Sequence, residues 1–112
     1  MSTDKGVVRL YNQDPCCGYV FTNNGFINLF QLMISAFSKD GWEKKNPDLP
    51  ILLIAGQDDP VIQSKRKYKK LVKFLNERGY QNTTQRLYPN MRHEILNERK
   101  KKMVYRDILR FM

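Results

Sequence analysis

Cysteine and histidine are scarce in this sequence of 112 residues, which holds two cysteines and a single histidine. The two cysteines, Cys16 and Cys17, are neighbours in the chain. Their Cα atoms therefore lie only about 3.8 Å apart across a trans peptide bond, too close for an ordinary disulfide. One histidine and no Cys-x-x-Cys spacing give no credible set of metal ligands. We expect free thiols in a reducing compartment, and neither a metal ion nor an organic cofactor.

The sequence also lacks a long apolar run. No window approaches the stretch of about 18 apolar residues that a membrane-spanning helix needs. The first residues have neither the apolar core nor the small-residue cleavage site of a signal peptide. A content of 41% hydrophobic and 12% aromatic residues is nevertheless enough for a packed core, which disfavours the disordered class. We expect one domain or less, located in the cytoplasm.

Positive charge is concentrated in the second half of the chain. Residues 1–59 contain five basic and seven acidic residues, a net charge of −2, whereas residues 60–112 contain fifteen basic and four acidic residues, a net charge of +11. A solvated helix face is the ordinary explanation, and a site for an anionic membrane surface or nucleic acid is the alternative. Nucleic acid is an unlikely partner, because the basic residues are not interleaved with base-stacking aromatics and no zinc finger or RNA-recognition signature is present.

Strand patterns and helix patterns alternate in the second half. Residues 51–55 are continuously apolar, as in a strand buried on both faces, and residues 82–88 are rich in β-branched and aromatic residues. Helices are predicted over 64–78 and about 97–110. This order implies a βαβ unit with parallel strands. Two parallel strands are not a stable domain by themselves, so we expect an incomplete sheet that is part of a larger one. The side chains predicted to be buried on the two helices are Tyr68, Leu71, Val72, Leu75, Val104, Ile108 and Phe111.

The first half has a short β-like run, VVRLY, at residues 7–11, and then a strongly apolar stretch. Nine of the twelve residues from 26 to 37 are apolar, which predicts a helix over about 24–38. A helix of this composition must be covered by protein or face a hydrophobic ligand, and core packing is the more common outcome.

Candidate functional side chains follow the two predicted strands. In open α/β sheets such groups gather beyond the carboxyl ends of the strands. Asp58 and Asp59 lie in the loop after the first strand, and His93 lies in the loop after the second. A carboxylate on one imidazole nitrogen fixes the tautomer and leaves the other nitrogen free as a general base, which makes two parts of a nucleophilic triad. Taken singly, an Asp before Pro often only starts a turn, and a lone loop histidine is more often structural.

Several stretches then carry a family resemblance. LPILLIAGQDDPV at 49–61, LYPNMRHEILNE at 87–98 and DILRF at 107–111 closely resemble the C-terminal third of α/β-hydrolases, in the branch of lysophospholipases, monoacylglycerol lipases and serine aminopeptidases. NQDPCCGYVF at 12–21 resembles the cap-proximal segment of that branch. The resemblance implies an α/β fold in which 49–112 form the C-terminal βαβα unit of the hydrolase core. Residues 1–48 would be a cap-proximal segment with a cap-derived helix at about 24–38.

The resemblance also implies roles for the two loops. Asp59, directly before proline, would be the triad acid, with Asp58 as the less fitting candidate, and His93 would be the base. The third part is missing, because no serine of the chain is flanked by glycines as in the Gly-x-Ser-x-Gly elbow. Cys16 or Cys17 would need an activating base to replace it, and the pair aligns with the cap rather than with an elbow.

We therefore expect the C-terminal fragment of a serine hydrolase that acts on carboxylic esters, lysophospholipase- or acylglycerol lipase-like, and is inactive alone. Its partner would be a missing N-terminal hydrolase part, and a lipid-like ester would be the substrate once the fold is complete. The alternatives are a non-catalytic fragment that self-associates into a homo-oligomer and a basic binding module for anionic lipid or nucleic acid. Binding to phosphates would weaken steeply with salt, which distinguishes the last of these.

Overall fold

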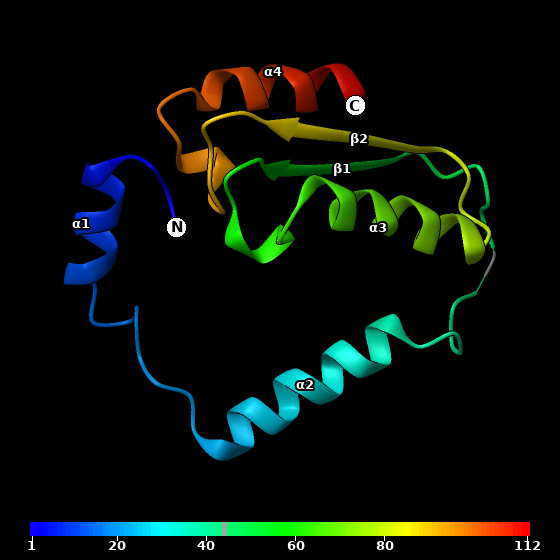
Figure 1. The fold of residues 1–112 in the computed structure, drawn as a ribbon, viewed down its shortest axis with the longest axis horizontal. Coiled ribbons are helices and arrows are strands. Elements are labelled where there is room, and N and C mark those ends of the chain that lie inside the picture. Colours follow the sequence, from blue (N-terminus) through cyan, green and yellow to red (C-terminus); the bar gives the residue numbers. More distant parts are fainter. Residues whose placement is uncertain (44) are drawn as a thin grey trace.

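The computed structural model describes residues 1–43 and 45–112 (Figure 1). The two strands, β1 (Ile51–Gly56) and β2 (Thr83–Tyr88), run parallel and pair in register from Ile51 opposite Thr83 to Gly56 opposite Tyr88. The helices and 3₁₀ turns are α1 (Lys5–Gln13), α2 (Asn23–Phe37), η1 (Pro60–Ile62), α3 (Lys65–Glu77), η2 (Ile95–Asn97) and α4 (Lys101–Phe111). The predicted strand–helix–strand–helix order and the parallel sheet are confirmed, and the architecture agrees with the expected α/β class.

The two-stranded sheet lies between α4 on one face and α3 on the other (Figure 1). The main core is on the α4 side, where Tyr88, Met91, Ile95 and Val104 are buried. Each such side chain stabilises the fold by about 1.5–3 kcal/mol through burial. The prediction that Phe111 joins this core is wrong, because this residue ends α4 and is 38% exposed.

Helix α3 begins and ends where its sequence indicates. The Ser64 hydroxyl accepts a hydrogen bond from the Lys67 N–H at 3.1 Å, and Gly79 follows the helix with a φ of 91°. Tyr68 and Leu75 are buried against the sheet, and Leu71 and Val72 of the predicted stripe are half-buried. Local capping and the apolar stripe therefore suffice to specify this helix.

The prediction of a short strand at 7–11 is wrong, because these residues lie inside α1. Asp4 caps the helix, with its carboxylate accepting a hydrogen bond from the Gly6 N–H at 2.8 Å. Val7, Val8 and Tyr11 are half-buried, whereas the residues between them are exposed, which is a helical and not an alternating pattern. The cap and the helical periodicity outweigh the β-propensity of two adjacent valines.

Helix α2 forms where predicted, but it is not packed into a core. Its N-cap is Thr22, whose hydroxyl accepts from the Gly25 N–H at 3.1 Å. Its large apolar side chains remain between 39% (Leu29) and 72% (Ile34) exposed. Figure 1 shows α2 apart from the sheet, both faces of which are already covered by other helices. The expectation of core packing is therefore wrong for the described residues, because the sheet leaves this helix no surface to cover.

The C-terminal end of α2 is held to α3 through one arginine. The Arg78 guanidinium donates to the carbonyls of Phe37 at 3.1 Å and Ser38 at 2.8 Å, and it lies 3.3 Å from the centre of the Phe74 ring.

Among the residues that the structure describes, no helix has the length and apolar character needed to cross a membrane.

Candidate active site

Asp59 is fixed by the turn that follows β1. Its Oδ1 atom accepts a hydrogen bond from the Val61 N–H at 2.9 Å and caps η1, in which Pro60 takes the first position. The residue is only 6% exposed. Because one carboxylate oxygen is occupied by the backbone of its own turn, the other, Oδ2, is directed to a partner outside that turn.

That partner is His93, which lies in the loop after β2. His93 Nδ1 lies 2.9 Å from Asp59 Oδ2. A carboxylate only accepts hydrogen bonds, so Nδ1 donates and carries the proton, and Nε2 is left with its lone pair. The imidazole is 58% exposed, whereas the Asp59 carboxylate behind it is buried. The arrangement is a base that faces outward, oriented by a buried acid.

Asp58, the second acid considered from the sequence, takes no part in this pair. It is exposed, and the hydrogen bond that the structure gives it is from its backbone N–H to the Met91 carbonyl at 2.9 Å. Of the two neighbouring carboxylates, only that of Asp59 is brought to the imidazole.

The two loops are joined through their backbones, and a glycine makes this possible. The Gln57 N–H donates to the Tyr88 carbonyl at 2.8 Å. A Cβ atom at Gly56 would lie 2.1 Å from the Arg92 carbonyl oxygen and 2.3 Å from that of Met91. Both are backbone atoms of the loop that carries His93, so only glycine allows this approach.

A second buried carboxylate, Glu98, lies behind the histidine loop. It is 1% exposed and accepts hydrogen bonds from the Arg92 N–H at 2.9 Å, from the Thr3 N–H at 2.8 Å and from the Thr3 hydroxyl. Sequence reasoning included Glu98 only within the stretch that carries the family resemblance and gave it no role. Its partners are up to 95 residues away in the chain, so no local pattern signals its burial.

Both carboxylates are held in the ionised form. Burial alone raises the pKa of Asp59, but the hydrogen bonds from His93 and from the Val61 N–H outweigh it, and the pKa lies below its usual value. Burial likewise raises the pKa of Glu98, and the donors on Thr3 and Arg92 lower it further than burial raises it. Asp107, which accepts from Tyr88 Oη at 3.1 Å and pairs with Arg86, also has a lowered pKa, because these partners outweigh its burial.

We expect the stability of the fold to decrease in acid because of these carboxylates. A carboxyl group whose pKa is lower in the folded state stabilises the fold above its unfolded pKa of about 4, and this contribution is lost as the pH falls through the folded pKa. Urea unfolding between about pH 6 and pH 2 should therefore show a decreasing free energy of unfolding, with a shallower decrease in Asp59→Asn and in Glu98→Gln. A free energy of unfolding that stays constant or rises over this range would contradict the arrangement.

The cysteines do not have the environment of a nucleophile. Cys16 and Cys17 are free, the first exposed and the second half-buried. Burial raises the pKa of the Cys17 thiol, and the nearby Asp14 carboxylate raises it further. A reactive cysteine needs the opposite shift, so Cys17 is not poised to replace the missing serine.

Two parallel strands with a crossover helix, a following helix and an Asp–His pair at their carboxyl ends define the C-terminal part of an α/β-hydrolase. The family model for serine aminopeptidase, S33, matches residues 1–100 of the chain. The chain therefore belongs to the serine aminopeptidase S33 family, and the resemblance to this branch is confirmed. No match was found among curated proteins.

Proposed function

We propose that this chain supplies the acid and the base of a serine hydrolase whose nucleophile lies on a part of the fold that these 112 residues do not encode. The observation that carries the proposal is the 2.9 Å contact between Asp59 Oδ2 and His93 Nδ1. His93 Nε2 takes the proton from the serine hydroxyl as the serine oxygen attacks the ester carbonyl, and it then returns the proton to the leaving alcohol. A water molecule then attacks the acyl-enzyme. His93 Nε2 accepts a proton from this water and returns it to the serine oxygen as the carboxylic acid leaves. Asp59 stays ionised and stabilises the imidazolium form.

The free edge of β1 supports a partner that continues the sheet. The Ile51 N–H donates to the carbonyl of Asn82, which directly precedes β2, and the Gln57 N–H donates to that of Tyr88. By alternation, the backbone groups of Leu52 and Ile54 point away from β2. In the described part of the chain, β1 pairs only with β2. An apolar edge of this kind, without proline or charge, is normally paired or covered. We propose that it pairs with a strand of the N-terminal hydrolase part that carries the serine.

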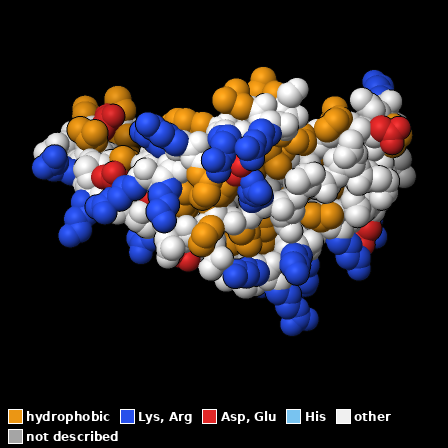
Figure 2. Space-filling model, turned by 90° about the horizontal axis from the view of Figure 1, so that it is seen from above, with side chains coloured by type: hydrophobic (Ala, Val, Ile, Leu, Met, Phe, Trp, Pro, Cys, Tyr) orange, Lys and Arg blue, Asp and Glu red, His pale blue; other side chains and the backbone are white. Residues whose placement is uncertain are grey.

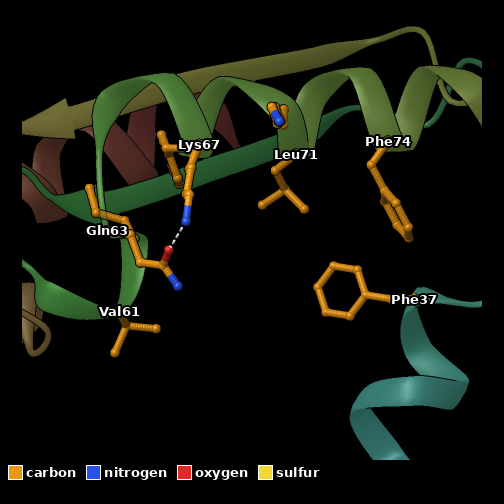
Figure 3. A pocket seen from close by; sticks show the side chains of 9 residues that line it. Phe37, Val61, Gln63, Lys67, Leu71 and Phe74 are labelled. Atoms are coloured by element: carbon orange, nitrogen blue, oxygen red, sulfur yellow. Dashed lines mark hydrogen bonds between the residues drawn. The ribbon is translucent and has the colours of Figure 1, made fainter.

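The apolar surface next to the site supports an ester with an apolar group as substrate, lysophospholipase- or acylglycerol lipase-like. An open groove of about 540 Å³ begins at Val61, two residues beyond Asp59, and continues along α3. Figure 3 shows Leu71 and Phe74 of α3 and Phe37 of α2 directed into it, with the Lys67–Gln63 hydrogen bond at its edge. Helix α2 would form part of the cap wall along which an acyl chain enters.

The free thiols agree with the cytoplasmic location that we propose for this protein.

Labelling with a fluorophosphonate probe tests the proposal. The chain of residues 1–112 alone should neither be labelled nor hydrolyse p-nitrophenyl esters, because the triad acts as a unit and its nucleophile is missing. The same chain joined to the N-terminal part of a serine aminopeptidase S33 protein, with its Gly-x-Ser-x-Gly elbow, should be labelled. Stoichiometric labelling of the chain alone would contradict the proposed division of the triad.

A self-associating fragment is the second candidate, because the free β1 edge and the exposed α2 face would both be covered in a dimer. Sedimentation of the chain alone should then show a dimer or larger species at micromolar concentration. A compact, stable monomer would exclude this candidate and leave the hydrolase proposal unchanged.

A basic binding module has less support. Figure 2 shows the lysine and arginine side chains spread over the face that bears α4, with apolar patches between them. Such an arrangement is that of a solvated surface. Binding to anionic vesicles or nucleic acid that weakens steeply between about 50 and 200 mM salt would revive this candidate.

A further inference from the structure

We infer that Glu98 is a positioning residue, whose buried carboxylate holds the backbone of the histidine loop in the place from which His93 meets Asp59. The inference rests on the proposed function, because it concerns the orientation of the base. It assigns a role to a side chain that lies outside the acid–base pair itself.

The first observation is that Glu98 is buried as an anion that backbone donors satisfy. No ion pair in the described part of the chain includes it, although the residues around it are rich in lysine and arginine. Its carboxylate oxygens instead accept hydrogen bonds from the N–H of Arg92, the N–H of Thr3 and the Thr3 hydroxyl. A buried carboxylate is costly unless such donors surround it, so this position is built to accept them.

The second observation is where these donors lie. The Arg92 amide, 2.9 Å from Glu98 Oε1, directly precedes His93 in the chain. The next amide, that of His93, donates to the Met1 carbonyl at 3.0 Å. Two consecutive amides of the loop are therefore fixed, one by Glu98 and the other by the segment that Glu98 holds through Thr3.

The third observation is that the segment at 1–4 is itself anchored beside Glu98. Ser2 is buried, its hydroxyl donates to the Asn97 carbonyl at 3.3 Å, and it accepts from the Asp4 N–H at 2.9 Å. The segment at 1–4 therefore lies against the histidine loop, and among the described residues Glu98 is the one side chain whose hydrogen bonds reach both of them.

NMR on the isotope-labelled chain of 112 residues tests this inference, with two readouts. The first is the ¹⁵N shifts of the imidazole, which report whether the proton is on Nδ1 or Nε2. The second is the hydrogen-exchange rate of the Arg92 amide. In Glu98→Ala, both acceptor oxygens are removed, so the buried N–H groups of Arg92 and Thr3 lose their common acceptor. We expect the Nδ1–H form of His93 to decrease and the Arg92 amide to exchange at least about fivefold faster than in the wild type.

Glu94→Ala is the matched control, because it removes the same kind of side chain from the residue directly after His93. Glu94 accepts from the Asn97 side chain at 3.1 Å and not from the loop amides, so both readouts should stay at their wild-type values. Thr3→Val provides a milder change if Glu98→Ala does not fold, since it removes the hydroxyl donor and keeps the N–H. It should shift both readouts in the same direction by a smaller amount.

The outcomes separate this inference from the proposed function. If the wild type has Nδ1–H and Asp59→Asn loses it, the acid–base pair stands. Wild-type readouts in Glu98→Ala, or in Thr3→Val when Glu98→Ala does not fold, then overturn the role of Glu98 alone. If the wild-type imidazole carries its proton on Nε2, the acid–base pair and the inference built on it are both contradicted.

Discussion

His93→Ala is expected to lower kcat by about 10⁶-fold in the completed hydrolase, and Asp59→Asn by about 10⁴-fold. Without the imidazole, nothing accepts the serine proton or returns it to the leaving group. With Asn at position 59, the carboxylate that accepts the hydrogen bond from His93 Nδ1, 2.9 Å away, is lost, so the imidazole is free to adopt the wrong tautomer. The measurement is ester hydrolysis by residues 1–112 joined to a nucleophile-bearing N-terminal part of the same family.

Asp58→Asn is the control for this prediction. It removes the same charge from the neighbouring position, but Asp58 is exposed and the structure gives it only a backbone contact to Met91. Its kcat should stay within about threefold of the wild type, as for a surface change away from the chemistry. Equal losses in Asp58→Asn and Asp59→Asn would show that the carboxylate acts through the general charge of the loop and not through the imidazole.

Gly56→Ala is expected to destabilise the fold by about 3 kcal/mol or more. The new methyl group would lie 2.1 Å from the Arg92 carbonyl oxygen and 2.3 Å from that of Met91. Neither neighbour is a flexible side chain, so the loop that carries His93 must move away from β1. Urea unfolding should show the lower stability, and the contact of His93 with Asp59 should be weakened in the molecules that remain folded.

Gly25→Ala provides the comparison for the same substitution. Gly25 lies in α2, where the nearest neighbour of an added Cβ is the Phe21 Cβ at 3.4 Å, an ordinary contact. Replacing a helical glycine by alanine should stabilise the chain by about 0.5–1 kcal/mol. If Gly56→Ala were as stable as Gly25→Ala, the close approach of the two loops would be wrong.

Local sequence was sufficient for the elements that set the site. The unalternating apolar run at 51–55 and the β-branched run at 82–88 each indicate a strand without reference to the rest of the chain. The crossover helix between them is fixed by Ser64 and Gly79. Parallel strands then require their carboxyl ends to meet, which is why two loops 34 residues apart in sequence, those of Asp59 and His93, could be placed together in advance.

One failure, the strand predicted at 7–11, overlooked a local signal, and the other two depend on contacts that no local pattern contains. Residues 7–11 suit a strand or a helix, and the Asp4 cap and the side on which Val7, Val8 and Tyr11 are covered decide between them. The exposure of α2 follows from how little sheet is available, which is a property of the whole fold. Glu98 is buried by the segment at 1–4, the most distant part of the chain in sequence.

The central claim is that a buried carboxylate holds the imidazole with its proton on Nδ1 and its lone pair on Nε2. Because His93 is the only histidine, the ¹⁵N spectrum of the imidazole is assigned without ambiguity. The measurement is made well above the ordinary imidazole pKa of about 6.5, on the wild type and on Asp59→Asn. The account predicts the Nδ1–H tautomer in the wild type and its loss in Asp59→Asn. An Nε2–H tautomer in the wild type, or the same spectrum in both proteins, would contradict it.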